Sequence, residues 1–298
     1  MQPISRGPSA ADDTTTSDAT SSPTFRRTVA TLCRVMGAGP RVREERVEAN
    51  GISIRYLDAG PAQAAQTIVF LHGGTGTAVR HWGRQVAEFG ARGYRALAPD
   101  HRGHGGTSND RDGLDQELMA QDVSAFVGAL GLGRVHVVGF SVGGVIGIYL
   151  ALAHPDQVAS LVTIGSHMTV DQHVRASNAT IEPGRIQIEE PDWAAQLREL
   201  HAPLYGPAHW RSVCRWLIET WNRQPAWTDE DLARVACPVL VGRGQFDERA
   251  VQSQIDRMAA AIQDARSFVV PGVGHYFHAT EPGRSALDRI LTGFLPPP

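Results

Sequence analysis

The sequence is poor in cysteine, in net charge and in long apolar runs. Its three cysteines, Cys33, Cys214 and Cys237, are scattered, which excludes a disulfide framework and a cysteine-based zinc site and is typical of a reducing cytoplasm. A formal net charge of -3 gives no excess of either sign for nucleic-acid or membrane-surface partners. No stretch approaches the roughly 18 apolar residues of a membrane-spanning helix. We therefore expect a cytoplasmic enzyme with a small-molecule substrate, no metal, no cofactor and no nucleic-acid or membrane partner. Composition leaves the oligomeric state open.

The first 41 residues differ in composition from the rest of the chain. Residues 1–24 are rich in Ser, Thr, Asp and Pro, so they cannot build a core and are predicted to be disordered. Arg26 and Arg27 precede an apolar stretch, as in a twin-arginine export signal, but Arg34 interrupts that stretch and no A-x-A cleavage site follows it. We interpret residues 1–41 as a flexible N-terminal extension.

From Val42 onward, strand and helix patterns alternate along the chain. Asn50-Gly51 separates two short segments of alternating polarity and predicts a hairpin, because both residues tolerate the positive φ of a tight turn. The predicted buried strands are residues 67–71, 94–98, 135–138, 160–164, 239–241 and 268–270, and the predicted helices are residues 79–91, 116–130, 142–153, 251–261 and 285–294. This alternation predicts an α/β fold, with a mostly parallel sheet and helices on both faces.

One segment, residues 166–235, breaks this alternation. It holds five of the six tryptophans and amphipathic patches at 193–200 and 211–221, but no convincing buried strand. A loop of that length without secondary structure is uncommon inside a compact domain, so we predict a helical insertion. The predicted core is then residues 42–165 together with 236–298. The tryptophans either form the core of the insertion or face an apolar substrate, and the sequence leaves both possibilities open.

Gly139-Phe140-Ser141-Val142-Gly143 matches the pattern G-x-S-x-G. It directly follows the predicted strand 135–138 and directly precedes an apolar helix, which is the strand–turn–helix context of a nucleophilic serine. A side chain at either glycine would collide with the neighbouring strand or helix. The helix N-terminus also stabilises an anion that forms beside the serine. We therefore predict Ser141 as the nucleophile.

A serine nucleophile needs an imidazole to take its proton and a carboxylate to orient that imidazole. Asp247 follows the predicted strand 239–241 and His275 follows the strand 268–270, so both belong to the same edge of the sheet as Ser141. The order Ser, Asp, His is also the one that accompanies this type of turn. We therefore predict Asp247 and His275 as the other catalytic residues. His72 and His278 have poorer positions as a base, and Glu248 and Asp171 have poorer positions as an acid. Asp171 is the rival acid to test.

A glycine-rich segment, His72-Gly73-Gly74-Thr75-Gly76, follows the first buried strand. Acyl transfer places negative charge on a carbonyl oxygen, and each preorganised backbone N–H group stabilises that charge by about 3–4 kcal/mol. We expect the amides of Gly74 and Val142 to form this oxyanion hole, and Gly73 to contact the substrate. A phosphate-binding loop would need the ending G-K-S/T or the spacing G-x-G-x-x-G, and this segment has neither.

Together these motifs resemble the α/β-hydrolase superfamily, in its serine-nucleophile branch, over about residues 42–295. Residues 99–108, PDHRGHGGTS, are similar to the superfamily's P-D-x-R-G-x-G-x-S stretch, in which Asp100 and Arg102 would brace loops. The strings GFSVGG and HGG resemble those of bacterial esterases, enol-lactonases, C–C bond hydrolases and cofactor-free haloperoxidases. The resemblance implies that residues 166–235 form a cap over the pocket. Haloalkane dehalogenases and epoxide hydrolases fit less well, because their nucleophile is an aspartate.

The residues and the resemblance predict a serine hydrolase that cleaves an ester or lactone of a small, apolar organic molecule through an acyl-enzyme. Three alternatives stay open. A C–C bond hydrolase could act on a β-diketone-like substrate with the same three residues, and an acyltransferase or lyase-type enzyme would use another acceptor than water. A non-catalytic ligand-binding protein on this fold would not need Ser141, Asp247 and His275 all intact. No motif encodes the substrate itself.

Overall fold

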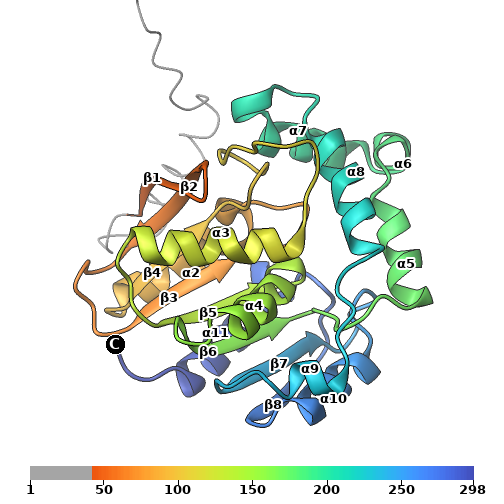
Figure 1. Cartoon of the computed structure of the whole chain (residues 1–298). Coiled ribbons are helices and arrows are strands. Elements are labelled where there is room, and N and C mark those ends of the chain that lie inside the picture. The colour runs from red at the N-terminus through yellow and green to blue at the C-terminus, as the bar shows by residue number, and fades with distance from the viewer. Residues whose placement is uncertain (1–41) are drawn as a thin grey trace, which may run out of the picture.

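The computed structural model describes residues 42–298 and shows a central sheet between two layers of helices (Figure 1). The predictions for residues 1–41, including Cys33, therefore lie outside the described residues. The sheet has eight strands in the order β1-β2-β4-β3-β5-β6-β7-β8. Only the pairs β1–β2 and β2–β4 are antiparallel, which confirms the predicted α/β fold with a mostly parallel sheet. The strands are β1 (Arg43–Ala49), β2 (Ile52–Ala59), β3 (Thr67–Leu71), β4 (Arg95–Pro99), β5 (Val135–Phe140), β6 (Val158–Ile164), β7 (Val239–Gly244) and β8 (Ala265–Val270).

The antiparallel edge begins with the predicted hairpin. Asn50 and Gly51 adopt φ values of 50° and 75°, as a tight turn requires. The side chain of Asn50 also donates to Oδ1 of Asp122 at 2.7 Å, which ties the turn to helix α3 (Gln116–Ala129). The strands extend beyond the predicted segments, because the solvent-exposed residues of β1 continue the backbone ladder where the apolar alternation has ended.

Helices cover both faces of the sheet (Figure 1). Besides α3, helices α4 (Val142–Ala153) and α10 (Gln252–Ala261) pack on one face, while α2 (Ala78–Ala91) and α11 (Gly283–Phe294) pack on the other. Helix α4 is apolar along almost its whole length, because β5, β6 and α3 enclose it. The sequence predicts each of these helices to within two residues at either end.

Between β6 and β7 the chain forms a series of helices that lies beside one end of the sheet (Figure 1). They are α5 (Gln172–Asn178), η1 (Ala179–Ile181), α6 (Pro183–Glu189), α7 (Pro191–Tyr205), α8 (Trp210–Trp221) and α9 (Asp229–Leu232). The two predicted amphipathic patches fall within α7 and α8. Helices α5, α6 and α9 are too short to show an apolar period in the sequence. The division into a core and an insertion at residues 166 and 235 stays a prediction.

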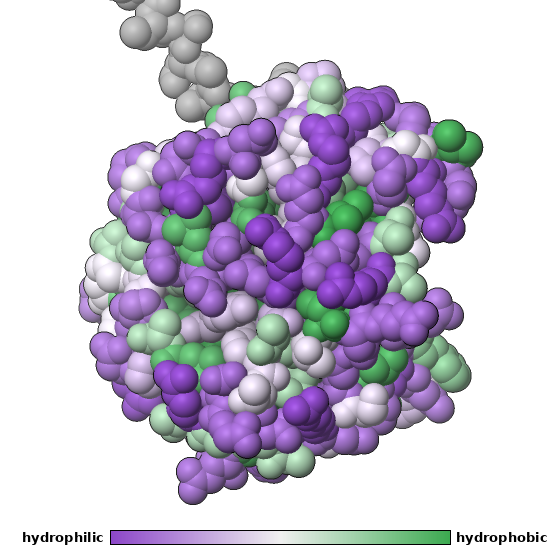
Figure 2. Space-filling model, turned by 45° about the vertical axis from the view of Figure 1, so that its right-hand side comes forward, coloured by the Kyte–Doolittle hydropathy of each residue, from purple (hydrophilic) through white to green (hydrophobic). Residues whose placement is uncertain are grey.

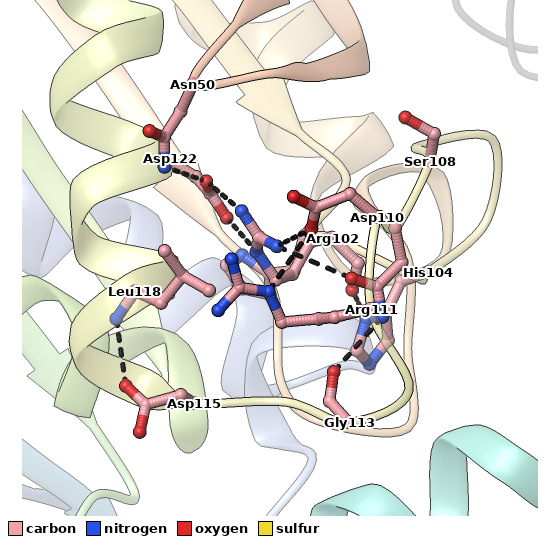
Figure 3. Close-up of polar contacts among 12 residues, drawn as sticks. Asn50, Arg102, His104, Ser108, Asp110, Arg111, Gly113, Asp115, Leu118 and Asp122 are labelled. Carbon is pink, nitrogen blue, oxygen red and sulfur yellow. Dashed lines mark hydrogen bonds and ion pairs between the residues drawn. The ribbon is translucent and has the colours of Figure 1, made fainter.

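Arg102 and Asp100, in the loop after β4, are buried and fully engaged. Nε and Nη2 of Arg102 donate to the two carboxylate oxygens of Asp122 at 2.6 Å, and Nη1 donates to Asp110 at 2.8 Å (Figure 3). Asp100 accepts from Arg55 at 2.6 Å and from the first N–H of α2 at 2.7 Å. Buried charges are costly unless they are paired in this way. The contacts agree with the bracing role that the resemblance implies, since they hold the loop against β2, α2 and α3.

Hydrophobic side chains form small separate patches among hydrophilic ones on the face shown in Figure 2. Most large apolar residues lie instead in the two layers between the sheet and its helices. No helix within residues 42–298 combines the length and the apolar character that crossing a bilayer would require. The packed layers fix the carboxyl ends of the strands, where the candidate site lies.

Candidate active site

Ser141 lies on the turn between β5 and α4. Its φ of 53° and ψ of -119° are strained for a residue with a Cβ, and its N–H donates to the carbonyl oxygen of Ile164 at 2.7 Å. A Cβ at Gly139 would overlap the backbone of Gly143, and a Cβ at Gly143 would overlap the backbone of Leu71. These are the collisions expected from the sequence. The turn therefore holds Ser141 at the carboxyl end of β5 and at the N-terminus of α4.

Asp247 and His275 lie in the loops that follow β7 and β8, and the structure brings them together. Nδ1 of His275 is 2.9 Å and 2.8 Å from the two carboxylate oxygens. Oδ1 of Asp247 also accepts the N–H groups of Arg249 and Ala250, at 2.8 Å and 3.0 Å. Burial would raise the pKa of Asp247, but these hydrogen bonds and the charge of a protonated His275 outweigh it, so the pKa lies below its ordinary value. The charged carboxylate fixes the proton of His275 on Nδ1 and leaves Nε2 as the basic nitrogen.

Ser141 and His275 line one small cavity together with the other predicted site residues, Gly73, Gly74 and Val142. We call it the inner cavity. Its volume of about 30 Å³ has room for a water molecule or two. The hydroxyl of Ser141 makes no hydrogen bond to any residue in the range 42–298. Catalytic hydrogen bonds of ligand-free enzymes often tighten only when substrate binds, so this is compatible with a role for Ser141.

A second cavity, which we call the outer cavity, adjoins the inner one. Its volume is about 270 Å³. Four residues line both cavities: Thr75, His81, Arg249 and Tyr276. These four residues therefore lie where the two cavities adjoin.

Buried histidines hold the glycine-rich segment 72–76 after β3. Four consecutive carbonyl oxygens of this segment each meet a ring nitrogen. The pairs are His72 O with His101 Nε2 at 2.9 Å, Gly73 O with His72 Nδ1 at 2.8 Å, Gly74 O with His104 Nε2 at 2.6 Å, and Thr75 O with His201 Nε2 at 3.2 Å. In addition, the Gly73 N–H donates to Nδ1 of His81 at 3.0 Å. The rings come from the segment itself, from α2, from the loop after β4 and from α7, so the backbone is fixed from several sides.

The proton position on His72 follows from its two contacts. Its Nε2 accepts the N–H of His101 at 2.9 Å, so this nitrogen carries no proton. Nδ1 then carries the hydrogen and donates to the carbonyl oxygen of Gly73. The same oxygen accepts the Gly76 N–H at 3.0 Å. The peptide group between Gly73 and Gly74 is thus held from its oxygen side, which fixes the direction of the Gly74 N–H.

Burial keeps these histidines uncharged. It lowers the pKa of His81, His101 and His201 to about 3 in each case, because a charged ring would lose its hydration, and repulsion from neighbouring cationic groups lowers it further. Burial likewise holds the pKa of His72 well below its ordinary value. Most ring nitrogens of these residues contact backbone groups, so the rings act as a scaffold. Within residues 42–298, no group of three or more His, Cys, Asp or Glu side chains is arranged to hold a metal ion.

The two amides expected to form the oxyanion hole have no acceptor among the described residues. Val142 is the first residue of α4, where helix geometry leaves the N–H without an intrahelical partner. The Gly74 N–H is likewise unpaired, whereas His81 takes the N–H of Gly73. A contact between Gly73 and substrate must therefore use another atom than its amide nitrogen. The indole of Trp221 packs so closely on Gly74 that a Cβ there would overlap the ring.

The four rival candidates for the base and the acid either make other contacts or face solvent. His278 is fully buried against aromatic rings, and His72 supports the glycine-rich segment. Asp171 caps α5 and accepts from the side chain of Gln254 at 2.8 Å, so its carboxylate is already engaged. Glu248 is exposed. No contact joins any of these carboxylates to His275 within the described range.

Several residues that support the segment 72–76 or line the cavities were not predicted from the sequence. His104 lies in the string RGHG, and a total of 12 histidines is the only general signal. His201 meets Thr75 across 126 positions of the chain, so no local pattern reveals the contact. No local pattern identifies Arg249 either, because its place between two cavities depends on the packing of α5 against the loop after β7.

Known proteins share this arrangement of elements. A sequence model of the Alpha/beta hydrolase family matches residues 68–287. The chain is 37% identical over 275 residues to the bifunctional esterase/perhydrolase DCH of Acinetobacter calcoaceticus, which covers 83% of this chain and 97% of the relative. It is 30% identical over 259 residues to RutD of Caulobacter sp. (strain K31), a protein named for carbamate hydrolysis, with coverage of 80% and 94%. The solved structure of Est816, described as an N-acyl homoserine lactone degrading enzyme, matches with a TM-score of 0.65 at 26% identity, covering 84% of this chain and 100% of that one.

Proposed function

Because the chain belongs to the alpha/beta hydrolase family and is a hydrolase, we propose that it cleaves an ester or lactone of a small organic molecule through an acyl-enzyme on Ser141. The observation that carries this proposal is the inner cavity. There Ser141, with its strained backbone, and His275, whose Nδ1 contacts the carboxylate of Asp247, both line the cavity. No other serine of the sequence stands in the pattern G-x-S-x-G.

The proposed reaction has two halves. Nε2 of His275 takes the proton from Ser141 as its oxygen attacks the carbonyl carbon, and Asp247 stabilises the charged ring. The ring then returns the proton to the departing alcohol oxygen. Water repeats these steps in the second half and releases the acid, which restores Ser141. In a lactone the departing oxygen stays attached to the acyl group, and the product is a hydroxy acid.

The amides of Gly74 and Val142 would stabilise the oxyanion that forms during both halves. Their N–H groups are free for an acceptor, and the peptide that carries the Gly74 N–H is held by His72. Such a donor is worth about 3–4 kcal/mol because it is oriented before the charge appears. This support for Gly74 is the main reason to prefer acyl transfer over simple ligand binding at this site.

The relatives and the cavity walls favour a compact substrate with apolar parts. Trp221 lines the inner cavity, Trp193 lines the outer one, and Tyr276 lines both. Of the tryptophans between β6 and β7, Trp210 is instead fully buried among the helices. DCH is named as an esterase and Est816 as a lactone-degrading enzyme, whereas RutD is named for carbamates. All three reactions begin with attack on a carbonyl carbon, so a test panel must hold all three substrate classes.

Labelling with a fluorophosphonate tests the nucleophile directly. The wild-type protein should react and lose activity, while Ser141→Ala should neither react nor turn over substrate. A panel of short esters, lactones and carbamates then identifies the bond that is cleaved. Labelling that persists in Ser141→Ala would refute the assignment, and failure of every serine-directed probe would favour a ligand-binding protein.

The same experiments separate the remaining alternatives. Release of a carboxylic acid from a β-diketone but not from esters would indicate C–C bond hydrolysis. Transfer of the acyl group to an added alcohol or amine, faster than to water, would indicate an acyltransferase. A cytoplasmic location, a small molecule as the only partner and a capping role for residues 166–235 stay predictions that accompany this proposal.

A further inference from the structure

Arg249 lies where the inner and outer cavities meet. It lines both of them, and it follows Asp247 by two positions in the loop after β7. The inner cavity holds only a few atoms, so the part of a substrate that does not react must pass this side chain. Arg249 is therefore placed to contact every substrate that reaches Ser141 through the outer cavity.

The guanidinium of Arg249 contacts only uncharged oxygens. Nη1 lies 3.1 Å from the hydroxyl of Ser177, and Nη2 lies 2.9 Å from the hydroxyl of Thr180. Nη1 is also 3.4 Å from the carbonyl oxygen of Ser177. No carboxylate forms an ion pair with this side chain within residues 42–298, although Arg249 is half-buried. A half-buried cation without a counter-charge attracts an anion, because the surrounding protein screens its charge less than water does.

Other charged residues of the outer cavity do not supply that counter-charge. Arg80 and Glu190 line it, and both are exposed to solvent. Their opposite charges offset each other, and water screens them. The uncompensated charge at the junction of the cavities is thus that of Arg249.

We propose that Arg249 is an anion-binding residue and that the substrate is an ester or lactone carrying a carboxylate away from the reacting bond. This rests on the proposed function. The reacting carbonyl lies at Ser141, the middle of the molecule packs against Trp221 and Tyr276, and the carboxylate meets the guanidinium. A planar guanidinium suits a carboxylate, because two parallel N–H···O bonds fix its orientation as well as its charge.

The contacts of Arg249 also allow a purely structural role, in which it ties the loop after β7 to α5 and η1. Such a tether needs hydrogen-bond donors but no charge, whereas an anion site needs the charge. Arg249→Gln keeps amide donors and removes the charge, and Arg249→Lys keeps the charge. Arg243 gives the matched control, because its Nη2 donates to the carbonyl oxygens of Gln245 and Asp247 in the same loop while its side chain lines neither cavity.

The experiment compares two esters with five-carbon acyl chains, 4-nitrophenyl hydrogen glutarate, which carries a terminal carboxylate, and 4-nitrophenyl pentanoate. The ratio of their kcat/KM values, corrected for spontaneous hydrolysis, is measured for the wild type and each variant. We expect Arg249→Gln to lower the ratio by about tenfold, mainly through KM, since the contact exists before and during reaction. Arg249→Lys should restore most of the ratio, and Arg243→Gln should leave it unchanged even if both rates fall.

An unchanged ratio in Arg249→Gln, or an equal loss for both esters, overturns the anion site and supports the tether. That result leaves the role of Ser141 intact, because pentanoate hydrolysis and fluorophosphonate labelling still depend on Ser141. If the wild type shows no Ser141-dependent labelling or hydrolysis, the proposed function fails, and the anion site fails with it.

Discussion

The buried histidines make the fold sensitive to acid, and the size of the effect follows from their pKa values. Burial lowers the pKa of His81, His101 and His201 to about 3 in the folded chain, whereas an unfolded chain has histidines near pKa 6.5. Between these two values the unfolded state binds more protons. The free energy of unfolding therefore falls as the pH drops below about 6.5, and this loss is complete near pH 3.

At pH 5 each of these histidines costs about 2 kcal/mol of stability, so the three together cost about 6 kcal/mol. Asp288 acts in the opposite direction, because burial and the neighbouring Glu88 raise its pKa to about 7. Its protonation between pH 7 and pH 5 returns at most about 2 kcal/mol. The loss from these four groups is about 4 kcal/mol, and the lowered pKa of other histidines such as His167 acts in the same direction. Since a typical domain has a total of about 5–15 kcal/mol, we expect marked destabilisation near pH 5.

Urea unfolding followed by tryptophan fluorescence at pH 7 and pH 5 measures this loss. His201→Gln takes up one proton fewer on unfolding near pH 5. The slope of its free energy of unfolding against pH should therefore be smaller than that of the wild type by about 1.4 kcal/mol per pH unit. His173→Gln is the matched control, because it makes the same change at an exposed position of α5. Equal free energies of unfolding at the two pH values in the wild type would refute the reasoning, as would identical dependences in the wild type and His201→Gln.

Three further predictions concern the site itself. Asp247→Asn should lower kcat for ester hydrolysis by about four orders of magnitude, because the amide no longer fixes the proton of His275 on Nδ1, and a loss below tenfold would argue against Asp247 as the orienting acid. Gly74→Ala should lower kcat because its Cβ displaces the indole of Trp221, and the double variant Gly74→Ala/Trp221→Ala should recover part of that loss. If the losses of the two single variants simply add in the double variant, the contact between Gly74 and Trp221 is contradicted. Gly143→Ala should lower the unfolding temperature by about 5 °C, because its Cβ overlaps the backbone of Leu71, and calorimetry that finds no shift would contradict that overlap.

The sequence predicts those parts of the fold whose signals are local. Each buried strand and each helix on the two faces carries its own apolar run or apolar period, and Asn50-Gly51 marks the turn of the hairpin. Ser141 is marked by the strand before it and the helix after it, and the structure brings Asp247 and His275 into contact as their places after β7 and β8 suggest. The catalytic roles of these residues stay predictions.

The remaining parts depend on contacts between distant segments. Helices α5, α6 and α9 have too few turns to show a period. Histidine rings as far away in the chain as position 201 contact the carbonyl oxygens of the segment 72–76. No pattern in the sequence near His201 predicts that contact, and none near Arg249 predicts its place beside the cavities. Such residues become visible only when the packing of the helices between β6 and β7 is known.

The helices between β6 and β7 are the part of the chain that a protein engineer would exchange in order to alter selectivity. In this protein that exchange would not be modular. His201 of α7 accepts the Gly105 N–H at 3.3 Å and donates to the carbonyl oxygen of Thr75, next to Gly74. Grafting a foreign set of helices would thus remove a support of the segment 72–76 together with residues that line the cavities. A working chimera would have to keep a side chain that donates to Thr75 from that position, and chimeras without one should lose turnover whichever substrate they were built to accept.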